Sequence, residues 1–219
     1  MRLFIAMVIA AGLILTGCGD SSSGPSADPD YLPVSVGNHW DYGIDGFMVS
    51  SSDDTLSVEG SFLREVTRTV THENGSALFE LEDISSLSVE IGDTVVVWTD
   101  TSYTYAFDAD SEFIGYDDSL SADYEIILKL PPTLGETWEP ETDDPTVVRE
   151  VVSLSASISV PSGNYTGCIH LRDTDSDDPD YLWNMYLVPD IGPAMFLMEE
   201  ADSSSFTHME VDLESYVIN

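Results

Sequence analysis

The chain has 219 residues, with 41 acidic side chains against 6 basic ones and a formal charge of −35 at pH 7. This charge argues against a nucleic-acid partner, because a polyphosphate would be repelled. Hydrophobic residues make up 42% of the chain, which is too many for a disordered acidic tail. A single long apolar run, at the N-terminus, excludes a helical membrane protein with several spans.

The N-terminal run predicts an export signal. Arg2 is followed by an apolar stretch from Leu3 to Leu15, which has the length of a signal-peptide core. The stretch ends in Leu15-Thr16-Gly17-Cys18, which resembles the lipobox of bacterial lipoproteins. The resemblance implies that residues 1–17 are removed, and that Cys18 carries a diacylglycerol on sulfur and an acyl chain, such as palmitate, on its amino group. The alternative is an ordinary signal peptide.

Residues 18–30 then form a predicted tether, since they are rich in Ser, Gly, Pro and Asp and hold no large apolar side chain. Two or more acyl chains anchor a protein durably without spanning the bilayer. In lipoproteins, Asp directly after the lipidated Cys favours the inner membrane. Gly19 stands at that position, so the outer membrane of the cell envelope is the expected location if the organism has one.

Residues 31–219 predict one β-rich domain. Apolar residues alternate with polar ones in several segments separated by turn residues, and the mature chain shows no sustained helical period. The clearest segments are Thr94–Phe107, Tyr124–Leu130, Val152–Val160 and Met209–Leu213. We therefore expect an all-β fold with a single antiparallel, meander-like curved sheet, as a half-barrel, a barrel or a sandwich. The sequence shows no internal repeat of convincing length.

Three segments in order resemble a diffuse group of uncharacterised β-rich bacterial envelope lipoproteins. They are Tyr31–Tyr42, then Leu128–Trp138 with Val160–Cys168, then Tyr186–Met195. Asp190 stands where that group usually has Gly. The resemblance implies a β-rich envelope domain and no catalytic activity.

Two sets of residues are candidates for the core or for a pocket. Trp40, Trp98, Trp138 and Trp183 either pack in the core or line an aromatic pocket. Lipidation of Cys18 would leave Cys168 without a disulfide partner, so we expect Cys168 to be a buried apolar residue.

The strongest candidate for a metal site is the acidic stretch Asp173–Asp180. Asp173, Asp175 and Asp177 alternate as in calcium-binding loops, whose carboxylate oxygens suit a hard cation. Asp178 and Asn184 stand where an EF-hand has Gly and Glu, and a solvated hairpin loop is the alternative. A zinc site from the four histidines (His39, His72, His170 and His208) has no motif to support it.

The sequence thus predicts a lipid-anchored envelope protein with a non-catalytic binding or structural domain. It predicts no cofactor other than calcium. The membrane is the partner that it identifies, and it leaves protein partners and the oligomeric state open. A carrier or chaperone for an apolar ligand, held on the concave face of the sheet, is the second hypothesis. A hydrolase is the third, although neither a Gly-x-Ser-x-Gly elbow nor a phosphate loop is present.

Overall fold

A computed structural model describes residues 29–49, 54–92, 94–109, 111–120, 122–141, 146–201 and 205–219. Cys18, the signal peptide and most of the predicted tether lie outside these residues. Within the described part, no helix has the length and apolar character needed to cross a bilayer.

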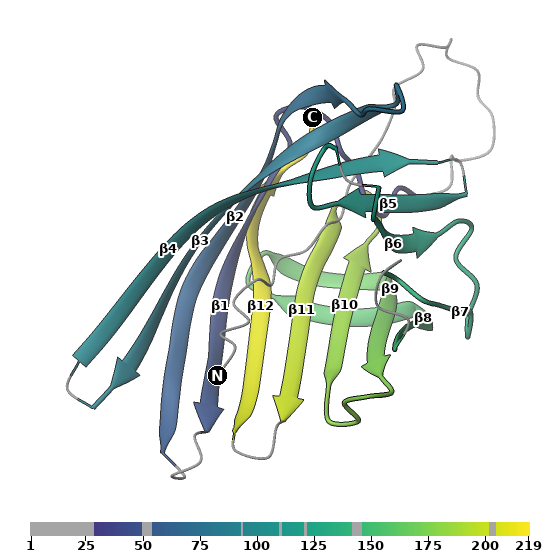
Figure 1. Ribbon diagram of the computed structural model, residues 1–219. Coiled ribbons are helices and arrows are strands. Elements are labelled where there is room, and N and C mark those ends of the chain that lie inside the picture. Colours follow the sequence, from purple (N-terminus) through teal and green to yellow (C-terminus); the bar gives the residue numbers. More distant parts are fainter. Residues whose placement is uncertain are drawn as a thin grey trace.

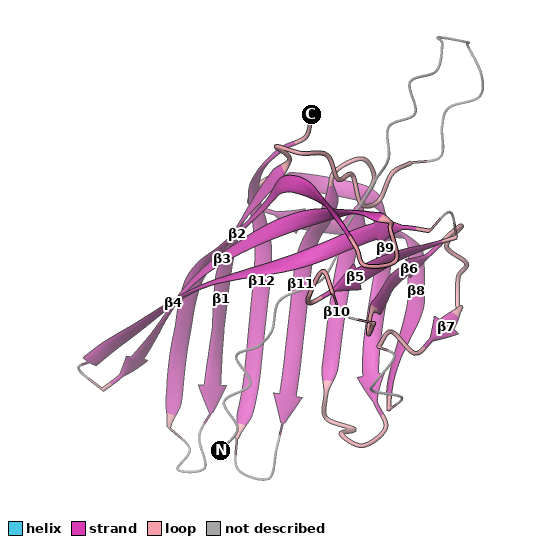
Figure 2. Ribbon diagram, turned by 45° about the horizontal axis from the view of Figure 1, so that its top comes forward, coloured by secondary structure: helices cyan, strands magenta, loops and turns pink. Residues whose placement is uncertain are grey.

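Over the described residues the fold is all-β, as predicted, and forms one antiparallel meander of twelve strands that is not closed (Figures 1 and 2). The sheet order is β6-β5-β4-β3-β2-β1-β12-β11-β10-β9-β8-β7. The strands are β1 (His39–Val49), β2 (Thr55–Thr71), β3 (Ala77–Ile91), β4 (Thr94–Asp108), β5 (Glu112–Tyr116), β6 (Glu125–Lys129), β7 (Thr137–Trp138), β8 (Val147–Val160), β9 (Gly163–Asp175), β10 (Leu182–Val188), β11 (Gly192–Ala201) and β12 (Phe206–Val217).

The first and last strands of the chain meet in the middle of the sheet. β1 pairs with β12 from His39 opposite Val217 to Val49 opposite Phe206. The two ends of the sheet are β6 and β7, which follow each other in the chain but share no full ladder. Between them the described residues show one isolated bridge, from Glu125 to Glu141, and a hydrogen bond of 2.7 Å from the Ile126 amide to the Pro140 carbonyl.

The alternation of side chains gives the sheet an apolar inner face and an acidic outer face. On β1 and β2, Tyr42, Phe62 and Val66 point inward into the core, whereas Asp41, Glu59 and Glu65 point outward. The β8–β9 hairpin crosses behind β10, β11 and β12 in Figure 1 and covers part of the inner face. Its turn is fixed by a hydrogen bond of 2.9 Å from the Ser162 amide to the Leu213 carbonyl on β12.

The two halves of the chain follow the same strand order and share short motifs, although the sequence shows no internal repeat of convincing length. Each half is a unit of six strands, β1–β6 and β7–β12. Each opens with Leu-Pro-x-x-x-Gly-x-x-Trp, first at Leu32–Trp40 and again at Leu130–Trp138. The glycines of both motifs, Gly37 and Gly135, have positive φ values of 90° and 77°, a conformation that favours glycine.

The backbone hydrogen bonds of these two motifs also match. The Gly37 amide donates to the Val66 carbonyl at 2.8 Å, and the Gly135 amide donates to the Val151 carbonyl at 2.9 Å. In return, the Val66 amide bonds the Asn38 carbonyl, and the Val151 amide bonds the Glu136 carbonyl. Short motifs that are weak in sequence therefore mark a duplicated turn that docks on the second strand of each unit.

Asp190 occupies the turn between β10 and β11 with a φ of 61°, in the left-handed region. Asp tolerates this region better than most residues. Its carboxylate accepts a hydrogen bond of 3.0 Å from the Asp30 amide, and its own amide bonds the Asp30 carbonyl. Asp190 thus adopts the backbone conformation of the Gly expected from the resemblance. It also holds the segment at Asp30 that leads into the first unit.

Candidate functional site

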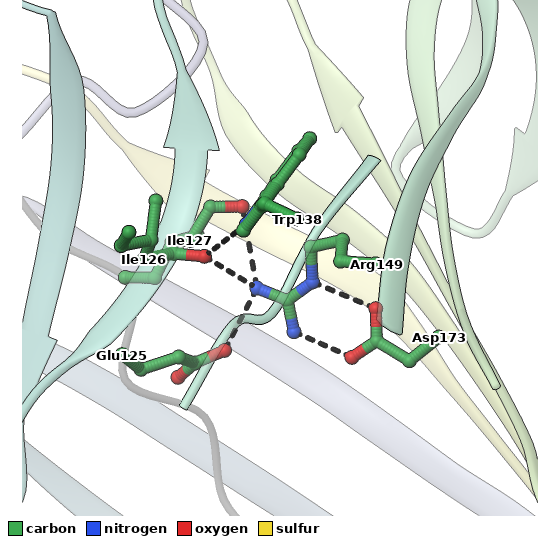
Figure 3. A network of polar contacts seen from close by, with 6 residues as sticks. All are labelled: Glu125, Ile126, Ile127, Trp138, Arg149 and Asp173. Atoms are coloured by element: carbon green, nitrogen blue, oxygen red, sulfur yellow. Dashed lines mark hydrogen bonds and ion pairs between the residues drawn. The ribbon is translucent and has the colours of Figure 1, made fainter. Parts of the chain in front are cut away.

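The most organised polar site lies where the two ends of the sheet approach each other (Figure 3). Its centre is Arg149 on β8, whose side chain is 3% exposed. The Nε and Nη2 atoms of Arg149 donate to the two carboxylate oxygens of Asp173 on β9, at 2.7 and 2.6 Å. The two residues stand directly opposite each other in the β8–β9 ladder, and this register gives the bidentate geometry.

The remaining nitrogen of Arg149 reaches the other end of the sheet. Nη1 forms an ion pair of 2.8 Å with Glu125 of β6 and donates to the carbonyls of Ile126 and Ile127 at 3.3 and 3.2 Å. The Trp138 indole also donates to the Ile126 carbonyl, at 2.8 Å. One side chain of β8 therefore occupies backbone acceptors of β6 that a neighbouring strand would otherwise bond.

Burial and stacking keep this guanidinium in place. Its central carbon lies 5.2 Å from the ring centre of Trp183 on β10, within cation–π range. Burial raises the pKa of the Glu125 carboxyl, although the positive charge of Arg149 opposes this shift. Because an arginine stays protonated in proteins, Arg149 keeps its positive charge in this buried site.

The first unit carries the counterpart of this ion pair. Arg64 on β2 donates to Asp83 on β3 from Nε at 2.7 Å and from Nη2 at 2.6 Å. Both side chains are buried, and the residues are again opposite each other in the ladder. Thr104 of β4 adds a contact of 3.4 Å to Asp83. Burial raises the pKa of Asp83, against the effect of Arg64.

The sequence around both pairs repeats as well. Arg64-Glu65-Val66 and Arg149-Glu150-Val151 lie on the second strands of the two units. They pair with Leu81-Glu82-Asp83 and Leu171-Arg172-Asp173 in the same register. We refer to Arg64–Asp83 and Arg149–Asp173 as the twin braces. Sequence reasoning missed them, although two Arg-Glu-Val and two Leu-x-Asp triplets were the signal.

The structure does not assemble the predicted calcium ligands into one site. Asp173 is buried in its brace. Asp177 is exposed in the following loop, where its amide donates to the Asp175 carboxylate at 2.9 Å. Among the described residues, no three His, Cys, Asp or Glu side chains are grouped closely enough to hold a metal ion. The calcium site therefore stays a prediction.

Three of the four tryptophans pack in the core, and the fourth does not. Trp40, Trp138 and Trp183 belong to one cluster of buried side chains, and Trp98 is 43% exposed on β4. An aromatic pocket lined by all four is therefore wrong. The Trp40 indole donates to the Ile191 carbonyl at 2.7 Å and fixes the β10–β11 turn.

His39, His170 and His208 lie on three different strands, and His72 follows the end of β2, so the four histidines do not form one site. His72 packs on Tyr116, and the His208 ring lies 3.2 Å from Glu199. His170 stacks on Tyr186, with ring centres 4.3 Å apart, and contacts Asn184. Cys168 is fully buried in the core, and burial raises the pKa of its thiol, which disfavours the reactive thiolate.

Comparison with known proteins gives distant structural likenesses. No family model and no curated protein sequence matches the chain. One similar crystal structure is an inferred exported protein with a YmcC-like fold from Bacteroides fragilis, at 9% identity and a TM-score of 0.36. Another is an inferred lipoprotein from Parabacteroides distasonis, at 11% identity and a TM-score of 0.37. Each match covers 86% of this chain and 99% of the other. At these TM-scores the likeness carries no argument about this chain.

Proposed function

We propose that the chain is a lipid-anchored protein of the bacterial envelope, and that its sheet is a non-catalytic structural or binding module. The anchor rests on the lipobox at Leu15–Cys18. The lack of catalysis rests on the twin braces, because the buried arginines of both units use their donors on carboxylates and carbonyls inside the sheet. Groups committed in this way hold strands together and are not free to act on a substrate.

The other basic side chains of the described residues are also used within the sheet. Arg68 pairs with Glu80 at 2.7 Å, Arg172 with Glu150 at 2.6 Å, and Lys129 with Glu136 at 3.8 Å. The many remaining carboxylates give the outer face its negative charge. A negatively charged face is well hydrated and repels anionic partners, which agrees with a module exposed to water outside the membrane.

The alternative of a carrier for an apolar ligand requires a hollow inner face. The centre of that face is filled by side chains from both units, among them Tyr42, Phe62, Met185 and Phe196. Tyr42 stacks on Phe62 with ring centres 5.4 Å apart and contacts Phe196 at 5.8 Å. This packing favours the structural or binding module.

The anchor is tested by metabolic labelling with a fatty acid. Wild-type protein should incorporate the label and sediment with membranes, and Cys18→Ser should lose both properties. Cys168→Ala is the matched control, since it removes the other cysteine of the chain and should keep the label. Labelling of the Cys18→Ser variant would show that the anchor is assigned to the wrong residue.

A further inference from the structure

One edge of the sheet is left without a neighbour along most of a long strand. β4 runs from Thr94 to Asp108, and β5 pairs with it from Tyr105 to Asp108. From Thr94 to Thr104, β3 lies on one side of β4 and no described strand lies on the other. Figures 1 and 2 show this part of β4 at the outer border of the sheet, away from the core. We call residues 94–104 the free edge.

The side chains of the free edge do not prevent pairing with another strand. Val95 and Val97 are 57% and 59% exposed, and Trp98 is exposed as well. The ladder to β3 runs without a bulge. Asp100 is the single charged residue of these eleven, and none is Pro or Lys. Proteins normally protect an exposed edge with charges, Pro, bulges or short strands, and the free edge has none of these but Asp100.

The two ends of the sheet, by contrast, are protected. β7 has two residues and is followed at once by Glu139 and Pro140. On β6, the Ile126 amide and carbonyl are bonded by Pro140, Trp138 and Arg149. Beyond its short pairing with β7, β8 also lacks an outer neighbour among the described residues, but three register shifts in its ladder to β9 make that edge irregular. β4 has a regular ladder and no such protection, which points to a use for the free edge.

We propose that the free edge pairs with the same segment of a second copy of this chain, as an antiparallel dimer with its twofold axis at Thr99. An isologous dimer needs a patch that complements itself, and an edge strand meets this need through backbone hydrogen bonds alone. Thr99 is the middle of residues 94–104, so this register pairs the whole free edge. It places Asp100 opposite Trp98 of the other copy, which keeps the two Asp100 carboxylates from facing each other directly.

The net charge of the chain sets the salt dependence of this dimer. Two copies with a formal charge of −35 each repel one another, and salt screens that repulsion. Asp100 is the single charge of the free edge, so two copies that meet there bring few charges close together. Dimer formation should therefore increase with sodium chloride concentration.

Cysteine cross-linking in membranes of cells that express the full chain tests the pairing. Directly opposite residues of an antiparallel pair have Cα atoms about 4.5–5.5 Å apart, within the range of a disulfide. Thr99→Cys should therefore give a band of twice the monomer mass on a non-reducing gel. Val95→Cys is the matched control on the same strand and face. It would lie roughly 27 Å from its symmetry mate at 3.4 Å per residue and should stay monomeric.

A second pair of variants separates edge pairing from general surface effects. In the Thr99→Cys background, Val97→Glu should reduce the cross-linked fraction several-fold, because it places a new charge at the free edge. Ile84→Glu adds the same charge on the adjacent β3, at a residue 40% exposed, and should leave the fraction unchanged. Equal cross-linking of Thr99→Cys and Val95→Cys, or none of either, would overturn the dimer. Capture of another protein by Thr99→Cys would show that the free edge serves a different partner.

Discussion

Arg149 and Asp173 lie directly opposite each other on β8 and β9 and share two hydrogen bonds of 2.7 and 2.6 Å in the interior of the protein. Arg64 and Asp83 repeat this relationship on β2 and β3. Two hairpins far apart in the sequence thus neutralise a buried arginine in the same way, with an Asp directly opposite on the next strand.

Breaking one brace should destabilise the protein strongly. Asp173→Asn leaves Arg149 buried with fewer negative partners, and removing one member of a buried pair typically costs about 3–5 kcal/mol. Urea unfolding should show a large fall in the midpoint. The matched control is Arg172→Gln, which breaks the half-exposed pair with Glu150 and should cost about 0–1 kcal/mol. Similar losses in both variants would contradict a special role for the brace.

The stability of the folded protein should depend on pH through Asp212 on β12. Burial, and next the charge of Glu210, raise the pKa of Asp212 from 3.8 to about 6. The folded state therefore holds the proton more tightly than the unfolded state. The stabilisation that the bound proton gives the folded state is complete below pH 3.8 and is lost as the pH rises to about 6.

The Asp212→Asn variant does not titrate and escapes this loss. Its stability relative to wild type should rise as the pH increases from about 4 to about 6. Urea midpoints measured at several pH values check this trend. Glu210→Gln should show a smaller change in the same direction, because it removes the second cause of the shift. A difference between Asp212→Asn and wild type that does not vary with pH would rule out the titration of Asp212.

Salt should stabilise the folded state. The formal charge of the chain is −35, and the proposed cleavage before Cys18 would remove Arg2 and make this charge one unit more negative. Repulsion between carboxylates should lower the melting temperature at low ionic strength. The gain with sodium chloride should level off near 1 M, where the Debye length is about 3 Å. A melting temperature that is independent of salt would show that this repulsion does not matter.

Calcium should act on the protein as a screening ion and no more, since Asp173 is engaged by Arg149. We expect wild type and an Asp175→Asn, Asp177→Asn double variant to respond equally to calcium at matched ionic strength. A bound ion would instead add about 2.7 kcal/mol at a hundredfold excess over its Kd. A larger rise in the melting temperature of wild type would therefore establish the predicted site. Asp173 is left unchanged in this test because its replacement would break the brace.

Local patterns in the sequence were sufficient to predict the type of fold. Alternation marked the strands, and the turn residues at His72–Gly75 and Pro161–Gly163 lie between paired strands. These signals are local, because a strand needs only its own period and its own turn residues.

The partners of the charged side chains were harder to predict, because they depend on register. A shift between Val66 and Arg68 in the β2–β3 ladder gives Arg68 the partner Glu80, twelve residues away in sequence. Bulges of this kind are not visible in the pattern of apolar residues. The duplication was visible in principle, since Leu-Pro-x-x-x-Gly-x-x-Trp occurs twice with the same spacing.

The β1–β12 ladder has a consequence for the order of folding. Most neighbouring strands in this meander are also neighbours in the chain, so each can pair as soon as the next one is present. β1 is different, because the partner of Trp40 is Tyr216, near the C-terminus. The first strand of the sheet must keep one side open until the last strand of the chain is available to pair with it. The β1–β12 ladder, in the middle of the sheet, is therefore the last ladder to form.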